Sequence, residues 1–218
     1  FYYLTVMNEN YEHPEMPEGA EEGIKRGMYL FEQDEKATVQ LMGSGVILRE
    51  VIKAAQILRD EYQIHSNVWS ATSFNELARD GMAVEEYNRL HPMAEAKESW
   101  VSQQLRGTKG IVVSATDHMR AYSEQIRAYL PDNRPFVALG TDGYGRSDTR
   151  AKLRSYFGVD AAHIVVATLK KLADEGEVDA RLVKDAISSF ELDTDRPVAW
   201  APQATPELHA VADYKEEN

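Results

Sequence analysis

Apolar positions along the chain alternate between short continuous runs and stripes repeated about every 3.6 residues. Short runs predict buried strands, and the spaced stripes predict amphipathic helices. The clearest stripe lies in residues 46–62, where Ile47, Val51, Ala55 and Leu58 share one helical face. The predicted strands span residues 38–42, 67–72, 110–116 and 136–139.

Further helices are predicted between and after these strands. Residues 75–105 contain two helices broken at His91-Pro92, because proline disfavours helix at the residue before it. Residues 119–130 form one helix that ends at Pro131. After the last strand only helices are predicted, over 149–157, 161–175 and 179–190, with N-caps at Ser147 or Asp148, at Asp160 and at Asp179.

This alternation of strands and helices predicts an α/β fold, doubly wound, with a mostly parallel sheet and flanking helices. Residues 1–7 have the pattern of a buried strand, 8–22 that of a polar, acidic surface connection, and 23–31 that of a helix end running into a strand. Because a strand needs neighbours, the opening run indicates a piece of a longer polypeptide.

Composition narrows the possible functions. There are 24 Lys and Arg against 36 Asp and Glu, a net charge of −12, which argues against non-specific duplex binding. No cysteine is present, so disulfides and thiolate chemistry are excluded. No apolar run approaches the roughly 18–20 residues that span a bilayer, and no signal peptide opens the chain. We therefore expect a cytoplasmic protein that binds neither nucleic acid nor membrane.

Gly43-Ser44-Gly45 lies between a predicted strand and a predicted helix, where doubly wound folds bind phosphate. Leu48 stands where the dinucleotide fingerprint requires its third glycine, and no Gly-Lys-Ser/Thr occurs. A lone Gly-x-Gly is weak, so a tight strand-to-helix turn is the favoured interpretation for Gly43 and Gly45.

The most unusual stretch is residues 140–148, at the carboxyl end of the last predicted strand, where α/β sheets place ligands. Its candidate structural or interface residues are Gly140, Asp142, Gly145, Arg146, Ser147 and Asp148. Either Arg146 grips an anion, or Asp142 and Arg146 pair with each other or with a partner chain while Ser147 caps the next helix. We expect Asp142 or Arg146 to fix the loop by hydrogen bonds, and Arg146→Ala to cost about 1–3 kcal/mol if its partner is buried.

No complete catalytic constellation is encoded. Asp117-His118 could pair as orienter and base, but Asp117 fits better as a helix N-cap. The six histidines never recur at metal-ligand spacing, and no Gly-x-Ser-x-Gly elbow occurs. No catalytic, cofactor-binding or metal-ligating residue is therefore assigned.

Three blocks resemble the C-terminal portion of the homodimeric pyruvate dehydrogenase E1 components, the thiamine-diphosphate enzymes of bacterial pyruvate dehydrogenase complexes. They comprise residues 7–11 with 16–24, residues 40–45 with 72–81, and residues 139–150. The similarity runs from residue 1 to about residue 192. The glycine segments also look like those of the transketolase C-terminal domain.

The resemblance implies three parts: 1–37 as the end of a pyrimidine-binding domain and a linker, 38–192 as a transketolase C-terminal-like domain, and 193–218 as a tail that stays flexible unless it docks. It also implies a parent enzyme that decarboxylates pyruvate and reductively acetylates a lipoyl group. Thiamine diphosphate and Mg²⁺ would bind outside this segment. The partners would be a second E1 subunit and the E2 dihydrolipoyl acetyltransferase.

Three hypotheses remain open on the sequence. The first is a non-catalytic C-terminal E1 domain that serves dimerisation and shapes the approach to the active site, so that the segment alone is inactive. The second is a freestanding α/β module that binds a phosphorylated small molecule at 43–45 or 140–145. The third is a non-catalytic scaffold fragment.

Overall fold

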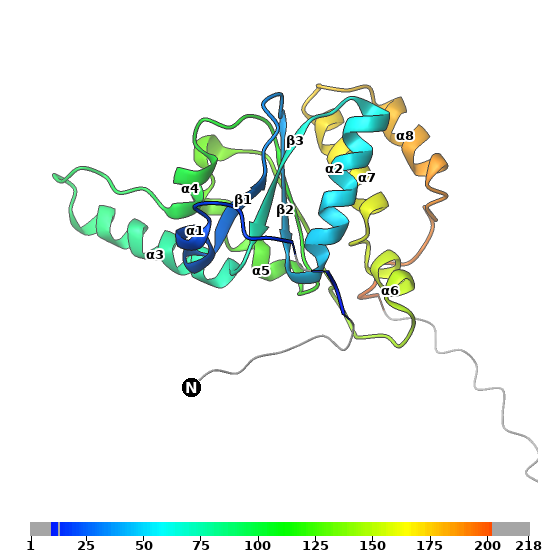
Figure 1. Cartoon of the computed structure of the whole chain (residues 1–218), viewed down its shortest axis with the longest axis horizontal. Coiled ribbons are helices and arrows are strands. Elements are labelled where there is room, and N and C mark those ends of the chain that lie inside the picture. The colour runs from blue at the N-terminus through cyan, green and yellow to red at the C-terminus, as the bar shows by residue number, and fades with distance from the viewer. Residues whose placement is uncertain (1–9, 13, 202–218) are drawn as a thin grey trace, which may run out of the picture.

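The computed structural model describes residues 10–12 and 14–201. Within them, five strands form one sheet in the order β1-β3-β2-β4-β5 (Figure 1). Strands β2 to β5 are parallel, and β1 runs antiparallel to β3 at one edge. The predicted mostly parallel α/β sheet is therefore confirmed, whereas the strand expected at 1–7 lies outside the described residues. The strands are β1 Met28–Glu32, β2 Val39–Ser44, β3 Ser66–Ala71, β4 Val112–Ala115 and β5 Phe136–Leu139.

Helices cover both faces of this sheet (Figure 1). Successive strand side chains point to opposite faces, so Leu41 enters one core and Met42 the other. Burial on both faces explains why the strands are continuous apolar runs rather than alternating ones. One face carries α2 Leu48–Tyr62, α7 Ala161–Asp174 and α8 Ala180–Ser189. The other carries α3 Phe74–Leu90, α4 Trp100–Leu105 and α5 Arg120–Glu124.

Several predicted helix ends are confirmed. Helix α3 ends at Leu90, before His91-Pro92, and α4 follows as a separate helix. Asp160 caps α7 by accepting a hydrogen bond from His163 N, and Asp179 caps α8. Among the described residues, no helix is both long and apolar enough to cross a bilayer.

The single helix predicted over 119–130 is wrong. Helix α5 spans only Arg120–Glu124, and two 3₁₀ turns follow, η2 Arg127–Tyr129 and η3 Pro131–Asn133. Hydrogen bonds three residues apart, such as Tyr129 N to Ile126 O, tighten the chain there and let Ile126 and Leu130 both reach the core. Asp117 caps no helix, since α5 begins three residues later.

The helix end and strand predicted over residues 23–31 are present, and the strand, β1, belongs to this sheet. Met28 pairs with Ala71 of β3 and is fully buried in the core. A short helix, α1 Glu21–Arg26, precedes β1 and ends at Gly27, whose positive φ of 104° forms its left-handed cap. The residues 1–37 that the resemblance assigns to a domain end and a linker therefore contain an edge strand of this sheet.

The start of α6 Arg150–Phe157 also differs from the prediction. Thr149, rather than Ser147 or Asp148, caps α6 through a hydrogen bond from Lys152 N.

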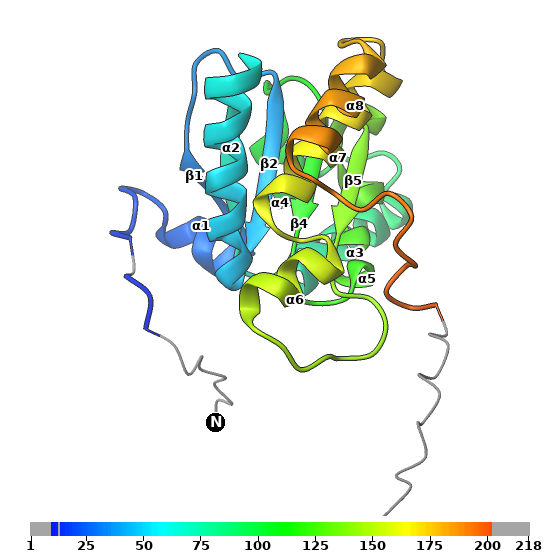
Figure 2. The same ribbon diagram turned by 90° about the vertical axis from the view of Figure 1, so that its right-hand side faces the viewer.

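The tail expected at 193–218 is described only to residue 201, and residues 196–200 lie against α6 and the loop after β5 (Figure 2). We call residues 196–200 the strap. The sequence predicts a tail that is flexible unless it docks, and these five residues do dock.

A buried carboxylate joins three helices on the α2 face. Glu50 of α2 accepts from the Arg154 guanidinium of α6 at 2.9 Å and from Ala161 N, the first amide of α7, at 3.2 Å. Its side chain is 8% exposed and that of Arg154 is 17% exposed. The pair therefore lies in a low dielectric, where each charge depends on the other. 

We predict that Glu50→Gln lowers the free energy of unfolding by about 3 kcal/mol, because it leaves the Arg154 charge buried without a carboxylate. Urea unfolding measures this. The matched control is Glu76→Gln, whose partner Arg79 is 75% exposed, and which should change stability by less than about 1 kcal/mol. Equal losses in the two variants would contradict the central place given to Glu50.

Candidate functional site

The Gly43-Ser44-Gly45 segment is a packed turn. Gly43 lies inside β2, and a Cβ there would meet Leu48 Cα at 2.7 Å. Gly45 has a positive φ of 55° and opens the 3₁₀ turn η1 Gly45–Ile47 that leads into α2. The absent side chain of Gly43 is thus used for contact between strand and helix rather than for the approach of a ligand.

The loop after β5 is fixed at its start by two residues. Asp142 accepts hydrogen bonds from Arg120 N at 3.0 Å and from the Arg120 guanidinium. Thr141 donates its N–H to His118 O and its hydroxyl to Asp117 O. Since Arg120 N is the first amide of α5, Asp142 caps that helix from a distant part of the chain. The expected hydrogen bonds of Asp142 are present.

The other candidates in this loop are exposed. Arg146 does not pair with Asp142, and its guanidinium instead lies 5.7 Å from the Tyr156 ring centroid. Ser147 caps no helix, and Asp148 accepts from Thr149 N and lies 3.8 Å from Lys152 Nζ. Among the residues that the structure describes, Arg146 has no buried partner, so the condition for the larger Arg146→Ala cost is not met there.

Two glycines let other backbone segments approach the loop closely. A Cβ on Gly140 would lie 2.6 Å from both Arg120 N and His118 O. A Cβ on Gly143 would lie 2.7 Å from Ala199 O of the strap, and its φ is 97°. Gly145, in contrast, faces open space. The loop is thus clamped between α5 and the strap, with its tip free.

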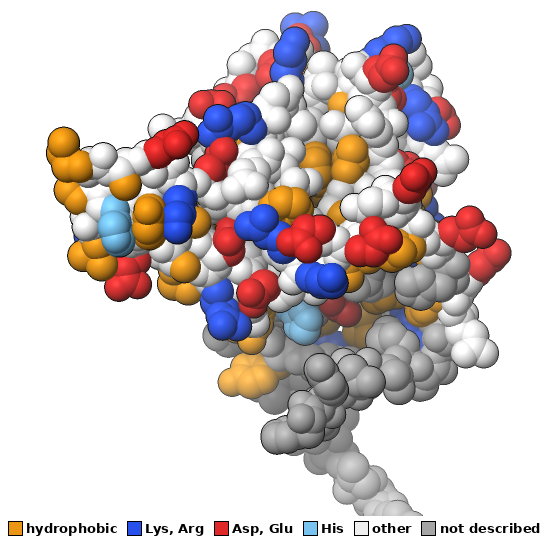
Figure 3. All heavy atoms as spheres, turned by 60° about the vertical axis from the view of Figure 1, so that its left-hand side comes forward, with side chains coloured by type: hydrophobic (Ala, Val, Ile, Leu, Met, Phe, Trp, Pro, Cys, Tyr) orange, Lys and Arg blue, Asp and Glu red, His pale blue; other side chains and the backbone are white. Residues whose placement is uncertain are grey.

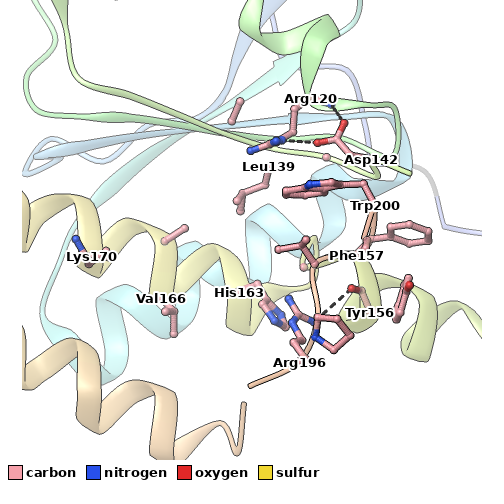
Figure 4. A pocket seen from close by; sticks show the side chains of 17 residues that line it. Arg120, Leu139, Asp142, Tyr156, Phe157, His163, Val166, Lys170, Arg196 and Trp200 are labelled. Carbon is pink, nitrogen blue, oxygen red and sulfur yellow. Dashed lines mark hydrogen bonds and ion pairs between the residues drawn. The ribbon is translucent and has the colours of Figure 1, made fainter. Parts of the chain in front are cut away.

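A cavity of about 390 Å³ lies beside this loop (Figure 4). Its walls are the end of β5, the last turn of α6, one side of α7 and the strap. Apolar side chains predominate, and cationic ones stand at its edges. The side chains that define it most clearly are Arg120, Leu139, Asp142, Tyr156, Phe157, His163, Val166, Lys170, Arg196 and Trp200.

Hydrogen bonds hold the strap and the first turn of α7 in place. Arg196 Nη1 donates to Ser155 O at 2.5 Å and to Tyr156 O at 3.3 Å, two carbonyls in the last turn of α6. The Arg120 guanidinium lies 5.0 Å from the Trp200 ring centroid. His163 Nδ1 lies 2.6 Å from Asp160 Oδ1. Burial alone would raise the pKa of Asp160, but hydrogen bonds and charge from His163 outweigh it and hold that pKa below its usual value.

No catalytic set appears among the residues that the structure describes. No three His, Asp or Glu side chains lie close enough there to hold a metal ion. Asp117 and His118 are exposed, and the His118 ring packs against Tyr122 with a centroid distance of 5.4 Å.

The sequence interpretation missed most of the cavity. Arg120, Arg196 and Trp200 carry no local signal, since their partners are distant along the chain. A signal did exist for His163, because Asp160 precedes it by three residues at a helix start, where the two side chains can meet. Only Gly140 and Asp142 of the candidates line the cavity.

Residues 27–160 match the family model described as the transketolase-like TK C-terminal domain. This stretch covers more than half of the chain. The chain belongs to the transketolase-like C-terminal domain family. The match begins just before β1 and ends before α7, so this family's domain includes the edge strand and the loop at 140–148.

Curated relatives of this transketolase-like domain are larger proteins. It is 52% identical over 199 residues to the pyruvate dehydrogenase E1 component of Pseudomonas aeruginosa and 48% identical over 198 residues to that of Escherichia coli K12. Each match covers 90% of this chain and 22% of the relative. Among solved structures, the transketolase of Campylobacter jejuni aligns with 67% of this chain and 19% of its own, at 20% identity and a TM-score of 0.46.

We predict that Asp142→Ala lowers stability by about 1–2 kcal/mol, because it removes the cap of α5 and the partner of Arg120. Hydrogen exchange should also accelerate at the amides of Arg120 and Thr141. Arg146→Ala, which removes an exposed side chain, is the control and should stay within about 0.5 kcal/mol of the parent chain. Protection of these amides that survives Asp142→Ala would contradict the role of the carboxylate.

We predict that Asp160 stabilises the fold in a pH-dependent way. Its pKa is lower in the folded than in the unfolded chain, so the stabilisation is present above about pH 4 and is lost as the pH falls through the folded value. The difference in unfolding free energy between the parent chain and Asp160→Asn should therefore shrink on acidification. Asp179→Asn controls for the loss of a cap carboxylate in general. The same pH dependence in both variants would contradict the contribution of His163.

Proposed function

We propose that the chain is the C-terminal domain of a pyruvate dehydrogenase E1 component. The observation that supports this proposal is a sequence identity of 44–52% with proteins of that name over 90% of the chain. The parent enzyme would decarboxylate pyruvate and reductively acetylate the lipoyl group of the E2 dihydrolipoyl acetyltransferase in the cytoplasm. This chain spans about a fifth of such a relative, so these activities belong to the longer protein.

Within that enzyme, we assign this domain to dimerisation and to shaping the approach to the active site. Large apolar side chains support an interface role, since Met82, Leu90 and Met93 are exposed along and just beyond the outer part of α3. Figure 3 displays hydrophobic side chains gathered at that projecting end. Contiguous apolar surface of this kind is typical of protein contacts, and the partner proposed is the second E1 subunit.

The proposed cofactors, thiamine diphosphate and Mg²⁺, belong to the rest of the enzyme. Thiamine diphosphate supplies the electron sink for decarboxylation of a 2-oxo acid. The described residues of this chain do not fit that group, because no metal-ligating cluster occurs among them and Gly43 is packed against α2. We therefore derive no chemical step from this domain and propose that it is inactive alone.

A hybrid enzyme tests this proposal. The region of the Pseudomonas aeruginosa relative that matches this chain is replaced by residues 1–218, and pyruvate-dependent acetylation of a lipoyl domain is measured with thiamine diphosphate and Mg²⁺. We expect activity within about tenfold of the parent enzyme, because packing within a family tolerates substitutions that keep volume and pattern. The 218-residue chain alone should release no CO₂ from pyruvate.

Two outcomes would contradict the proposal. A hybrid that forms a folded dimer and binds thiamine diphosphate but lacks activity would show that this domain is not interchangeable with an E1 C-terminal domain. Turnover by the isolated chain would show that catalytic groups lie within it. A matched hybrid with Met93→Asp tests the interface role, and it should form dimers more weakly than the hybrid without the substitution.

A further inference from the structure

The cavity between the strap and α7 has the features of a small-molecule site. Its volume of about 390 Å³ lies within the usual range for ligand pockets, about 300–1,000 Å³, at the small end. Leu139, Phe157 and Val166 provide apolar walls, and the strap with Trp200 closes one side (Figure 4). Such a space suits a compact apolar or aromatic body.

The charges at the edge of the cavity are not equally neutralised. Arg120 pairs with Asp142, Lys170 pairs with Asp174, and His163 lies against Asp160. Arg196 differs, since within residues 10–12 and 14–201 its guanidinium forms no ion pair and donates hydrogen bonds only from Nη1, to carbonyl oxygens. A half-buried guanidinium with Nε and Nη2 still available is suited to a carboxylate.

Arg196 also presents one of these donors at the edge of the cavity. Its Nη2 lies 3.0 Å from the position that a Cβ on Gly158 would take, and the His163 ring lies 3.4 Å from the same point. A side chain at residue 158 would therefore occupy the space between them. Asp160 lies at this edge beside His163, so a single negative charge fits it better than the double charge of a phosphate ester.

We propose that this cavity binds a compact apolar or aromatic monocarboxylate, with the carboxylate on Arg196 and the body against Leu139, Phe157 and Val166. This proposal rests on contacts within the chain itself and does not depend on the proposed function. Because the strap supplies both Arg196 and the Trp200 wall, an occupied cavity holds the strap against α6 and α7.

Benzoate serves as the probe for the full 218-residue chain, with benzamide as the neutral compound of the same shape. Binding is followed by NMR through the Arg196 Nε–H, the Trp200 indole N–H and the Val166 methyl signals. We expect all three to shift with benzoate and the affinity for benzamide to be at least about tenfold weaker, since only benzoate carries the charge. Equal affinity for both, or shifts that avoid these three groups, overturns the proposal.

Variants separate the two halves of the site. Arg196→Gln should lower the affinity for benzoate at least about tenfold. The control Arg181→Gln, on the exposed surface of α8 away from the cavity, should bind benzoate as the parent chain does. Since Arg196→Gln could also release the strap, Val166→Phe fills the cavity and leaves Arg196 intact. Unchanged binding in Val166→Phe overturns the proposal. Inorganic phosphate that competes with benzoate as well as benzoate itself shows a plain anion site, which overturns it too.

Discussion

The ion pair between Glu50 and Arg154 is the contact on which this half of the molecule depends. It fixes α6 and the first amide of α7 to α2, which is itself packed on the sheet. The strap is anchored in turn on the last carbonyls of α6 through Arg196. A shift of α6 would therefore carry the strap with it and open the cavity. Burying this ion pair carries a large desolvation cost. Its main effect is therefore to fix one arrangement of the three helices rather than to add net stability.

The loop at 140–148 depends on a second contact, between Asp142 and Arg120, at the opposite side of the cavity. Asp142 satisfies the first amide of α5, so the helix and the loop hold each other in place. Gly140 and Gly143 allow backbone contacts that a side chain would prevent. Two of the glycines in this loop thus allow close contacts within the protein's own backbone, whereas the tip at Gly145 faces open space.

The sequence predicted the repetitive elements well because their signal is local. Strands β2 to β5 and helices α2, α7 and α8 follow from apolar periodicity and from caps a few residues away. The predictions failed where a structural feature depends on residues that are distant along the chain. Nothing near Arg120 indicates that Asp142 will cap its helix, and nothing near Met28 indicates that β1 will pair with β3. Glu50 did carry a signal, since it lies on the apolar face of α2, three residues after Ile47 and four before Ala54.

Arginine is the residue that joins distant elements in this acidic chain. Arg154 binds Glu50, Arg120 binds Asp142, and Arg26 binds Asp80 at 3.5 Å while lying over the Trp100 ring. Each of these guanidiniums combines a carboxylate with a further contact, which is the use that a planar group with five donors favours. Arg196 occupies the same kind of position between the strap and α6 but has only carbonyl partners there. The chain has 36 acidic residues, yet the half-buried Arg196 at the edge of the cavity pairs with none of the described ones. Its guanidinium can therefore accept a carboxylate from a ligand as partner.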